Sequence, residues 1–268
     1  MRIDFSKYHG TGNDFILIDN RKADYNLSKI HLELLMHRRF GIGSDGLMLL
    51  SNASGYDFRM TYYNSDGNEG TMFGNGGRCI VKFAYDLGII KQKTNFISID
   101  GPHDALIKES QLIQLQMTDV KGIRPIDKDF YLNTGSPHYV RFVENIENFE
   151  VTTVGRPIRH ANNTNVNFIE LTNDYLFVRT FERGVEDETY SCGTGVVASC
   201  IISYLKNTEN NNAIHIEKID NTNEKKVTIL VKTLGGDLSV CFNHIGDSFT
   251  NIWLTGPAVK VYEGWVEL

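Results

Sequence analysis

Residues 58–88 read FRMTYYNSDGNEGTMFGNGGRCIVKFAYDLG, and this stretch decides the fold. Apolar and polar side chains alternate over residues 58–63, which predicts a strand. Residues 74–77 are glycine-rich and predict a turn, after which residues 78–87 carry apolar side chains at helical spacing and end at Gly88. The stretch therefore predicts a strand, a glycine-rich turn and a helix, in that order.

Residues 175–205, YLFVRTFERGVEDETYSCGTGVVASCIISYL, repeat the same order. A strand-like segment again precedes a glycine-rich turn, and an apolar helix is predicted over residues 196–205. Glu69 and Glu188 each stand five positions before the first glycine of their turn. An internal duplication is the simplest explanation of this repeat.

The rest of the chain adds short strands and at least one helix, which indicates an α/β or α+β class. Short β-rich segments lie at residues 96–99, 112–117, 226–232 and 252–255. A helix is predicted over residues 27–40, with its apolar side formed by Ile30, Leu34, Leu35 and Met36. The Asn-rich residues 207–212 predict a surface loop.

Length, charge and hydropathy exclude several classes of protein. The chain has 268 residues, enough for one large or two modest domains, and its 27 basic and 33 acidic residues give a net charge of −6. Nucleic acid is therefore not expected as a partner. Residues 1–10 include charged side chains where a signal peptide would be apolar, and the longest apolar-rich run, residues 196–205, is about half a membrane span. We expect a cytoplasmic protein that does not cross a membrane.

Residues 41–46, GIGSDG, match the dinucleotide-binding pattern GxGxxG. That pattern requires a strand before it and a helix after it, whereas here a predicted helix precedes it and the strand-like residues 47–50 follow. We therefore expect no nucleotide at this position and interpret Gly41 as a helix C-cap.

The four cysteines form no CxxC pair, and no histidines have metal-ligand spacing, so neither a disulfide nor a metal is expected. Cys79 and Cys200 lie inside predicted helices, where a cysteine is usually a small buried hydrophobe. Cys192 lies directly before the second glycine turn, where the helix dipole lowers the pKa of a thiol. Both turns open helices whose free N–H groups favour an anion, so a small carboxylate is the expected kind of ligand.

Seven motifs, taken in order, resemble those of the diaminopimelate epimerase family. They are residues 10–15 (GTGNDF), 41–46 (GIGSDG), 64–67 (NSDG), 74–79 (GNGGRC), 135–138 (GSPH), 165–168 (NVNF) and 181–195 (FERG through CGTG). The resemblance covers nearly the whole chain.

This resemblance implies an α/β (α+β) fold of two pseudo-symmetric halves. Each half is a curled mixed β-sheet around a central helix, and the active site is expected in the cleft between them. The N-terminal half is expected at residues 1–118 with a returning strand at residues 256–268, and the C-terminal half at residues 119–255.

The family inverts an α-carbon without a cofactor, and the resemblance implies conversion of LL-diaminopimelate to the meso form for lysine and peptidoglycan precursors. One cysteine thiolate removes the α-proton, and a second cysteine thiol delivers a proton to the opposite face. Cys192 matches one of the two cysteines. The family motif and the internal duplication both place its partner at position 73, where this chain has Phe73.

Phe73 has no acid or base group, and its ring is larger than a thiol side chain, so we expect inversion to be strongly impaired. Phe and Cys codons differ at one base, so a recent or engineered change and a naturally diverged paralogue both stay open. Two other functions stay open as well. One is a non-catalytic amino-acid-binding protein, and the other is single-base proton exchange or elimination on another amino acid by Cys192.

The remaining family positions are present in this chain. His138 and Glu182 match residues that help to set thiol protonation, and with Phe73 present His138 is expected to lose its partner. Positions that match substrate contacts are Asn13, Asn64, Asn165, Glu182 and Arg183 for the distal amino-acid end, and Gly74, Asn75, Gly193 and Thr194 for the reacting carboxylate. Gly46 and Ser136 stand where some relatives carry Gln and Asn. The implied partner is a small-molecule substrate, no cofactor is implied, and a homodimer is compatible with the resemblance.

Overall fold

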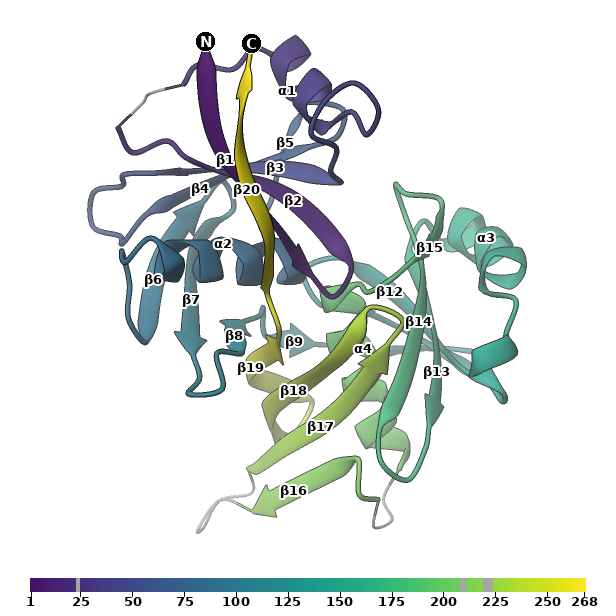
Figure 1. Cartoon of the computed structure of the whole chain (residues 1–268). Helices are drawn as coiled ribbons and strands as arrows, with labels where there is room; N and C mark the ends of the chain where they lie inside the picture. The colour runs from purple at the N-terminus through teal and green to yellow at the C-terminus, as the bar shows by residue number, and fades with distance from the viewer. Residues whose placement is uncertain (23–24, 208–210, 219–223) are drawn as a thin grey trace. The chain divides into compact units, whose positions relative to one another are not determined.

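A computed structural model describes residues 1–22, 25–207, 211–218 and 224–268 (Figure 1). The chain forms two units: unit 1 is Met1–Leu115 with Pro257–Leu268, and unit 2 is Gln116–Gly256. Unit 1 curls around the helix α2 (Gly74–Asp86). No helix among the described residues is long and apolar enough to span a membrane.

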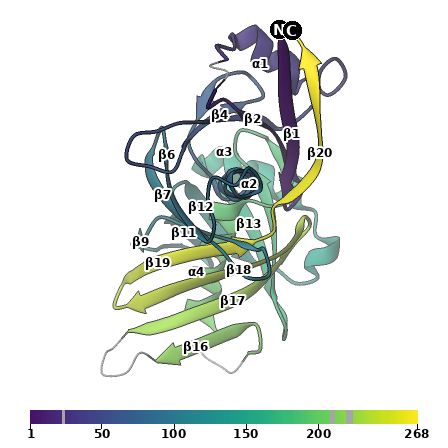
Figure 2. The ribbon, with the colours of Figure 1, turned by 60° about the vertical axis from the view of Figure 1, so that its left-hand side comes forward.

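The sheet of unit 1 begins with the last strand of the chain. Its order is β20 (Val259–Glu267), β1 (Arg2–Gly10), β2 (Asn13–Asp19), β3 (Gly46–Ser51), β4 (Arg59–Asn64), β6 (Lys93–Ser98), β7 (Gly101–Ile107) and β8 (Ile113–Gln116), with β5 (Glu69–Gly70) paired to β4. β2 pairs with β3 and β4 with β6 in parallel, and the other pairs are antiparallel. The predicted return of the C-terminal strand to the first half is confirmed by the pairing of β20 with β1. Figure 2 looks almost along α2 and shows the strands of unit 1 curving around it.

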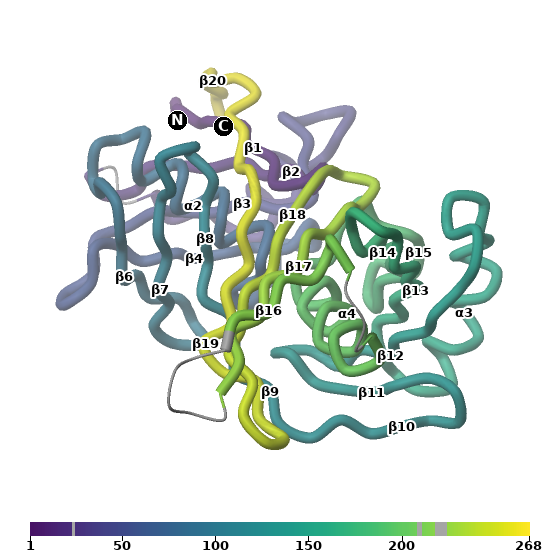
Figure 3. The backbone as a smooth tube through the Cα atoms, turned by 90° about the horizontal axis from the view of Figure 1, so that it is seen from below, coloured from purple at the N-terminus to yellow at the C-terminus, as the bar shows by residue number. Residues whose placement is uncertain are grey.

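Unit 2 is built in the same way around α4 (Gly193–Lys206). Its sheet order is β10 (Arg124–Ile126), β11 (Asp129–Asn133), β12 (Pro137–Phe142), β13 (Asn165–Leu171), β14 (Leu176–Glu182), β17 (Lys225–Thr233), β18 (Gly236–Ile245), β19 (Ser248–Gly256) and β9 (Val120–Lys121). β15 (Asp187–Thr189) pairs with β14, and β16 (Ile214–Lys218) pairs with β17. α4 packs against β11, β12, β13, β14, β18 and β19, as the tube drawing shows for the strands beside it (Figure 3).

The two units share one topology, which confirms the predicted duplication and the fold of two pseudo-symmetric halves. The run β1-β2-β3-β4-β6-β7-β8 corresponds to the run β11-β12-β13-β14-β17-β18-β19. The parallel pairs β2–β3 and β4–β6 recur at the same places as β12–β13 and β14–β17. In each unit the long helix begins at the glycine turn that follows the short strand β5 or β15.

The helix predicted over residues 27–40 is shorter in the structure, and a different set of its side chains is buried. It is α1 (Lys29–Met36), and its buried side chains are Leu32, Leu35 and Met36, whereas Ile30 is 74% exposed and Leu34 is 42% exposed. The following loop ends the helix early, because the N–H groups of Ile42, Gly43 and Ser44 bond to the last helical carbonyls.

The C-cap of α1 is His37, so the interpretation of Gly41 as the cap was wrong. Gly41 is instead needed for close approach, since a Cβ at this position would lie 1.9 Å from the Leu34 carbonyl oxygen. The expected strand after this loop is present as β3.

A helix that the sequence reading missed, α3 (Val151–Asn162), follows β12 and the 3-10 turn η1 (Ile146–Asn148). It contains Gly155 and Pro157, which weaken the helical signal in the sequence. Gly155 allows the helix to lie close to β14, since a Cβ there would be 2.7 Å from the Cβ of Phe181. The predicted loop over residues 207–212 lies partly outside the described residues.

A partly buried ion pair network joins β1 and β2 of unit 1 to the loop after α1. The Asp14 carboxylate lies 2.7 Å from Lys7 Nζ and 2.7 Å from Arg38 Nη2. Burial raises the pKa of Asp14, but hydrogen bonds from Arg38 and Lys7 outweigh burial and hold that pKa well below its usual range. The Lys7 side chain is only 7% exposed, so this carboxylate pairs with a cation that is largely removed from water.

Replacing Asp14 by Asn should lower the free energy of unfolding at pH 7 by about 3 kcal/mol, because Lys7 would be left buried without its anion. The pKa of Asp14 is lower in the folded state, so its contribution is present above the unfolded-state pKa of about 3.9 and is lost as the pH falls. Urea unfolding of both chains between pH 7 and pH 3 measures this. The difference should shrink on acidification, and the same substitution at the exposed Asp237 should have little effect.

Candidate functional site

The first glycine turn, residues 73–77, begins with Phe73 as the N-cap of α2. Phe73 is half-buried and its ring contacts two other aromatic rings, with centroid distances of 4.8 Å to Tyr62 and 5.6 Å to Phe15. A Cβ at Gly76 would lie 2.8 Å from Phe73 Cζ and 2.9 Å from Met48 Cε. The ring therefore fills an apolar position against the first turn of the helix.

The carboxamide of Asn75 is held in one orientation by a buried guanidinium. Arg78 is 0% exposed, and its Nη2 donates to Asn75 Oδ1 at 3.0 Å and to Thr11 Oγ1 at 3.1 Å. Asn75 Nδ2 consequently points the other way, to Asn13 Oδ1 at 3.5 Å, and Asn13 Nδ2 donates to Asp45 at 2.7 Å. The structure thus brings Asn13, Asn75 and the start of α2 together and fixes the polarity of both amides.

Asn64 ends β4 and is exposed, and its Nδ2 donates to the Asn68 carbonyl at 3.4 Å. It pairs in the sheet with Gly46, whose missing side chain leaves room for the Tyr62 ring. The hydrogen bond of Asn64 to Asn68 thus lies within its own turn, residues 64–68.

The second glycine turn, residues 192–195, begins with Cys192 as the N-cap of α4. Cys192 Sγ lies 3.5 Å from Thr194 Oγ1, and Thr194 Oγ1 lies 2.9 Å from Nε2 of the fully buried His138. Ser136 Oγ joins the same group, at 2.9 Å from His138 Nε2 and 3.0 Å from Thr194 Oγ1. Within unit 2, the hydrogen-bond partners of His138 are Thr194, Ser136 and Asn167. The loss of a thiol partner at position 73 stays a prediction.

The pKa of the Cys192 thiol differs from the sequence-based prediction. Burial, with a smaller contribution from the nearby Glu182 carboxylate, raises this pKa to about 12. The Thr194 hydroxyl and the backbone N–H groups of Gly195 and Thr194 act in the opposite direction. The prediction of a lowered pKa was therefore wrong, because it took account of the helix N-terminus but not of burial. Cys192 rests as a thiol, with donors in place that favour its thiolate.

Asn165, Glu182 and Arg183 lie at adjacent strand ends of unit 2. Asn165 Oδ1 accepts from the Arg183 backbone N–H at 2.9 Å, and Asn165 Nδ2 donates to the Pro137 carbonyl at 3.1 Å. Glu182 accepts a hydrogen bond from the Thr189 hydroxyl at 2.8 Å. The side chain of Asn165 therefore fixes the backbone at Arg183, and the charge of the exposed Arg183 acts on the buried His138.

The strand registers show which residues of the two units are equivalent. In unit 1, Tyr63 pairs with Glu69 on one side and Leu47 on the other, and Leu47 pairs with Ile16. In unit 2, Phe181 pairs in the same way with Glu188 and Val166, and Val166 pairs with Tyr139. The equivalent pairs around the turns are Phe73 and Cys192, Phe15 and His138, Met48 and Asn167, and Tyr62 and Thr180. The same framework thus surrounds an aromatic ring in unit 1 and a thiol with polar partners in unit 2.

Sequence reasoning missed three buried polar residues behind these turns, Arg78, Asn167 and Thr180. Arg78 and Asn167 are part of recognised motifs, but nothing in their spacing indicates burial or partners. Thr180 lies opposite Asn167 in the sheet, and this pairing depends on the register of β13 and β14.

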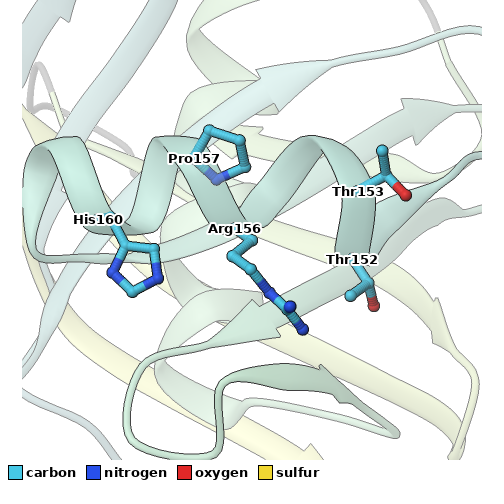
Figure 4. Close-up of a pocket in the computed structure, with 5 residues that line it drawn as sticks. All are labelled: Thr152, Thr153, Arg156, Pro157 and His160. Atoms are coloured by element: carbon cyan, nitrogen blue, oxygen red, sulfur yellow. The ribbon is translucent and has the colours of Figure 1, made fainter.

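Two surface hollows lie elsewhere on unit 2. One is on α3 and is lined by Thr152, Thr153, Arg156, Pro157 and His160 (Figure 4). The other is lined by residues 147–152 with Arg179 and Glu188. None of the site residues predicted from the sequence lines either hollow.

Comparison with known proteins agrees with this geometry. The family model described as diaminopimelate epimerase matches residues 5–122 and 130–261. The diaminopimelate epimerase of Flavobacterium psychrophilum is 49% identical over 264 residues, covering 96% of this chain and 97% of that protein. The diaminopimelate epimerase of Chlorobaculum tepidum is 40% identical over 272 residues, covering 97% of this chain and 99% of that protein.

Solved structures share the fold at much lower identity. A phenazine biosynthesis protein of the PhzF family from Bacillus anthracis has a TM-score of 0.75 at 14% identity and covers 100% of both chains. A hydroxyproline epimerase from Agrobacterium vitis has a TM-score of 0.63 at 11% identity, covering 99% of this chain and 92% of that one. These two likenesses show the fold alone. The match of the family model and the identity to the curated relatives show that the chain belongs to the diaminopimelate epimerase family.

Proposed function

We propose that this chain is a cofactor-independent diaminopimelate epimerase whose inversion of LL-diaminopimelate to the meso form is strongly impaired by Phe73. The proposal depends on one observation. Of the two equivalent N-cap positions, one carries Cys192 with polar partners, and the other carries Phe73 among apolar side chains. Inversion requires an acid–base group from each turn, and only the second turn has one.

The second glycine turn is suited to remove an α-proton. Cys192 lies at the N-terminus of α4, and the backbone N–H groups of Thr194 and Gly195 act on its sulfur. A carboxylate bound at the same helix N-terminus would be stabilised as its negative charge develops into an enediolate. In this proposal Gly193 and Thr194, with Gly74 and Asn75 of the first turn, hold the reacting carboxylate.

The other polar groups suit the second amino-acid end of the substrate. Asn13 Oδ1 is an acceptor that suits an ammonium group, since its Nδ2 is already bonded to Asp45. Glu182 and Arg183 supply charges of both signs, and Asn64 and Asn165 supply amide oxygens. This double set favours a substrate with two amino-acid ends and supports diaminopimelate over an amino acid with one.

A second candidate function follows from the intact partners of Cys192. The thiolate would take the α-proton of one stereocentre, the electron pair of the Cα–H bond would remain on the substrate as an enediolate, and a solvent-derived proton would return from Cys192 to the same face. Such single-base exchange needs no group at position 73. A binding protein without catalysis would leave the hydrogen-bonded group at Cys192 without a chemical role.

As an epimerase of this family, the chain would act in the synthesis of lysine and peptidoglycan precursors. Its cytoplasmic location and its assembly as a homodimer stay predictions.

Restoring a thiol at position 73 should restore inversion. LL-diaminopimelate is incubated with this chain and with its Phe73→Cys variant, and the meso product is followed by chiral chromatography. The variant should be at least about a hundredfold faster, which is the scale on which a lost general acid or base acts. If neither chain inverts the substrate, diaminopimelate is the wrong substrate. If both invert it at equal rates, Phe73 is not the lesion.

The same substitution should destabilise unit 1, because the Phe73 ring fills space between Phe15, Tyr62 and Met48. Phe73→Cys should lower the free energy of unfolding by about 2 kcal/mol, less than for a fully buried ring. Phe40, which is 79% exposed, provides the matched control, and Phe40→Cys should change stability by less than about 0.5 kcal/mol. Equal losses in the two variants, measured by urea unfolding, would show that the ring at position 73 contributes no packing.

A further inference from the structure

Asn167 lies behind the second glycine turn and is completely buried. Its Nδ2 donates to the Tyr139 carbonyl at 3.1 Å and lies 3.0 Å from His138 Nδ1. Its Oδ1 accepts from the Thr180 hydroxyl at 3.0 Å. Since a backbone carbonyl can only accept, the atom beside Tyr139 and His138 is the amide nitrogen.

This orientation determines which nitrogen of His138 carries the proton. An amide N–H pointing at Nδ1 requires Nδ1 to be an acceptor, so a neutral imidazole has its hydrogen on Nε2. His138 is neutral, because burial and the charge of Arg183 lower its pKa to about 3. The Nε2–H group then donates toward the hydroxyl oxygens of Thr194 and Ser136, each 2.9 Å away.

The tautomer decides where the Thr194 hydroxyl hydrogen points. When Nε2 donates, Thr194 Oγ1 accepts from His138, and its own hydrogen is available for Cys192 Sγ at 3.5 Å. With the other tautomer Nε2 would be an acceptor and would take a hydroxyl hydrogen from Thr194 or from Ser136. The first arrangement draws no hydroxyl hydrogen to His138, so it favours a Thr194 donor on the sulfur and hence the thiolate.

We propose that Asn167 is a positioning residue for the base, which fixes His138 as the Nε2–H tautomer and so directs the Thr194 hydroxyl onto Cys192. The inference rests on the proposed function only in taking Cys192 as the base. Asn167 does not touch Cys192 itself and acts through His138 and Thr194.

Two features of the fold support this role. A Cβ at Gly195 would lie 2.2 Å from Asn167 Oδ1 and 3.3 Å from His138 Cε1, so glycine at this position lets the polar pair lie against α4. In unit 1 the equivalent positions are Met48 and Phe15, which can neither donate nor accept in this way. The relay from Asn167 through His138 and Thr194 to Cys192 is therefore confined to the unit whose helix N-cap is a thiol.

The first test is the tautomer itself, read from long-range proton–nitrogen NMR of ¹⁵N-histidine-labelled protein at pH 7. In this chain His138 should carry its hydrogen on Nε2 alone. In Asn167→Leu, which keeps the volume but removes the donor, both tautomers should appear. A hydrogen on Nδ1 in the unsubstituted chain would overturn the proposal even if the variant fails to fold.

The second test is the reactivity of the Cys192 thiol with iodoacetamide at pH 8, followed by peptide mass spectrometry. Asn167→Leu and Thr194→Val should each slow alkylation by up to about tenfold, which corresponds to a change of one pKa unit. If they act in one relay, the double variant should be no slower than Thr194→Val alone. Additive losses, or an unchanged rate in Asn167→Leu, would contradict the relay.

Thr180→Val provides the matched control. It removes the other hydrogen bond of Asn167 but leaves the amide nitrogen held by the Tyr139 carbonyl. It should lower stability while leaving the tautomer unchanged and the alkylation rate within about twofold. A loss of reactivity equal to that of Asn167→Leu would assign the effect to packing alone. None of these measurements uses diaminopimelate, so their outcome is independent of the substrate assignment.

Discussion

The close approach of a helix glycine to the strand behind it is the constraint on which both turns depend. At Gly76 and Gly195 a single added carbon would lie within 3 Å of a side chain from the sheet. This contact fixes where α2 and α4 begin and therefore where their N-cap residues and free N–H groups lie. The side chains of the sheet that lie against this glycine then determine the chemical environment of the N-cap residue.

The two units apply this constraint with opposite chemistry. In unit 2 the sheet presents His138 and Asn167, and the N-cap is a thiol with a hydroxyl partner. In unit 1 the sheet presents Phe15 and Met48, and the N-cap is a phenyl ring that packs on them. Phe73 is thus accommodated by its surroundings, and the Asn75 amide at the start of α2 is still held by Arg78. In the proposed function, the chain lacks a proton carrier at position 73 but keeps the residues that would recognise the substrate.

Much of this framework could be predicted from the sequence, because glycine turns, strand alternation and helical spacing are local signals. The repeat of strand, turn and helix, the strand that returns to β1 and the position of Cys192 were all predicted correctly. What failed depends on tertiary structure. α3 was missed because Gly155 and Pro157 obscure its period, and the exposed Ile30 could not be told from the buried Leu32 without knowing which face of α1 meets the sheet.

The candidate site shows the same difference between local signals, which the sequence contains, and tertiary contacts, which it does not. The glycine turn pointed to Cys192, and the family resemblance pointed to Thr194 and His138, but the predicted direction of the thiol pKa was wrong because a motif does not reveal burial. The importance of Asn167 arises from the register that places it opposite Thr180 and beside His138, and no sequence spacing expresses that register.

The central claim is that this chain has one competent base, Cys192, and none at position 73. The most direct measurement is loss of α-protons in D2O, followed by proton NMR, with LL- and meso-diaminopimelate given separately to this chain. The account predicts that one of the two isomers exchanges an α-proton without changing configuration and that the other does not exchange. Exchange of both isomers at similar rates, conversion of one isomer into the other, or no exchange of either would contradict it.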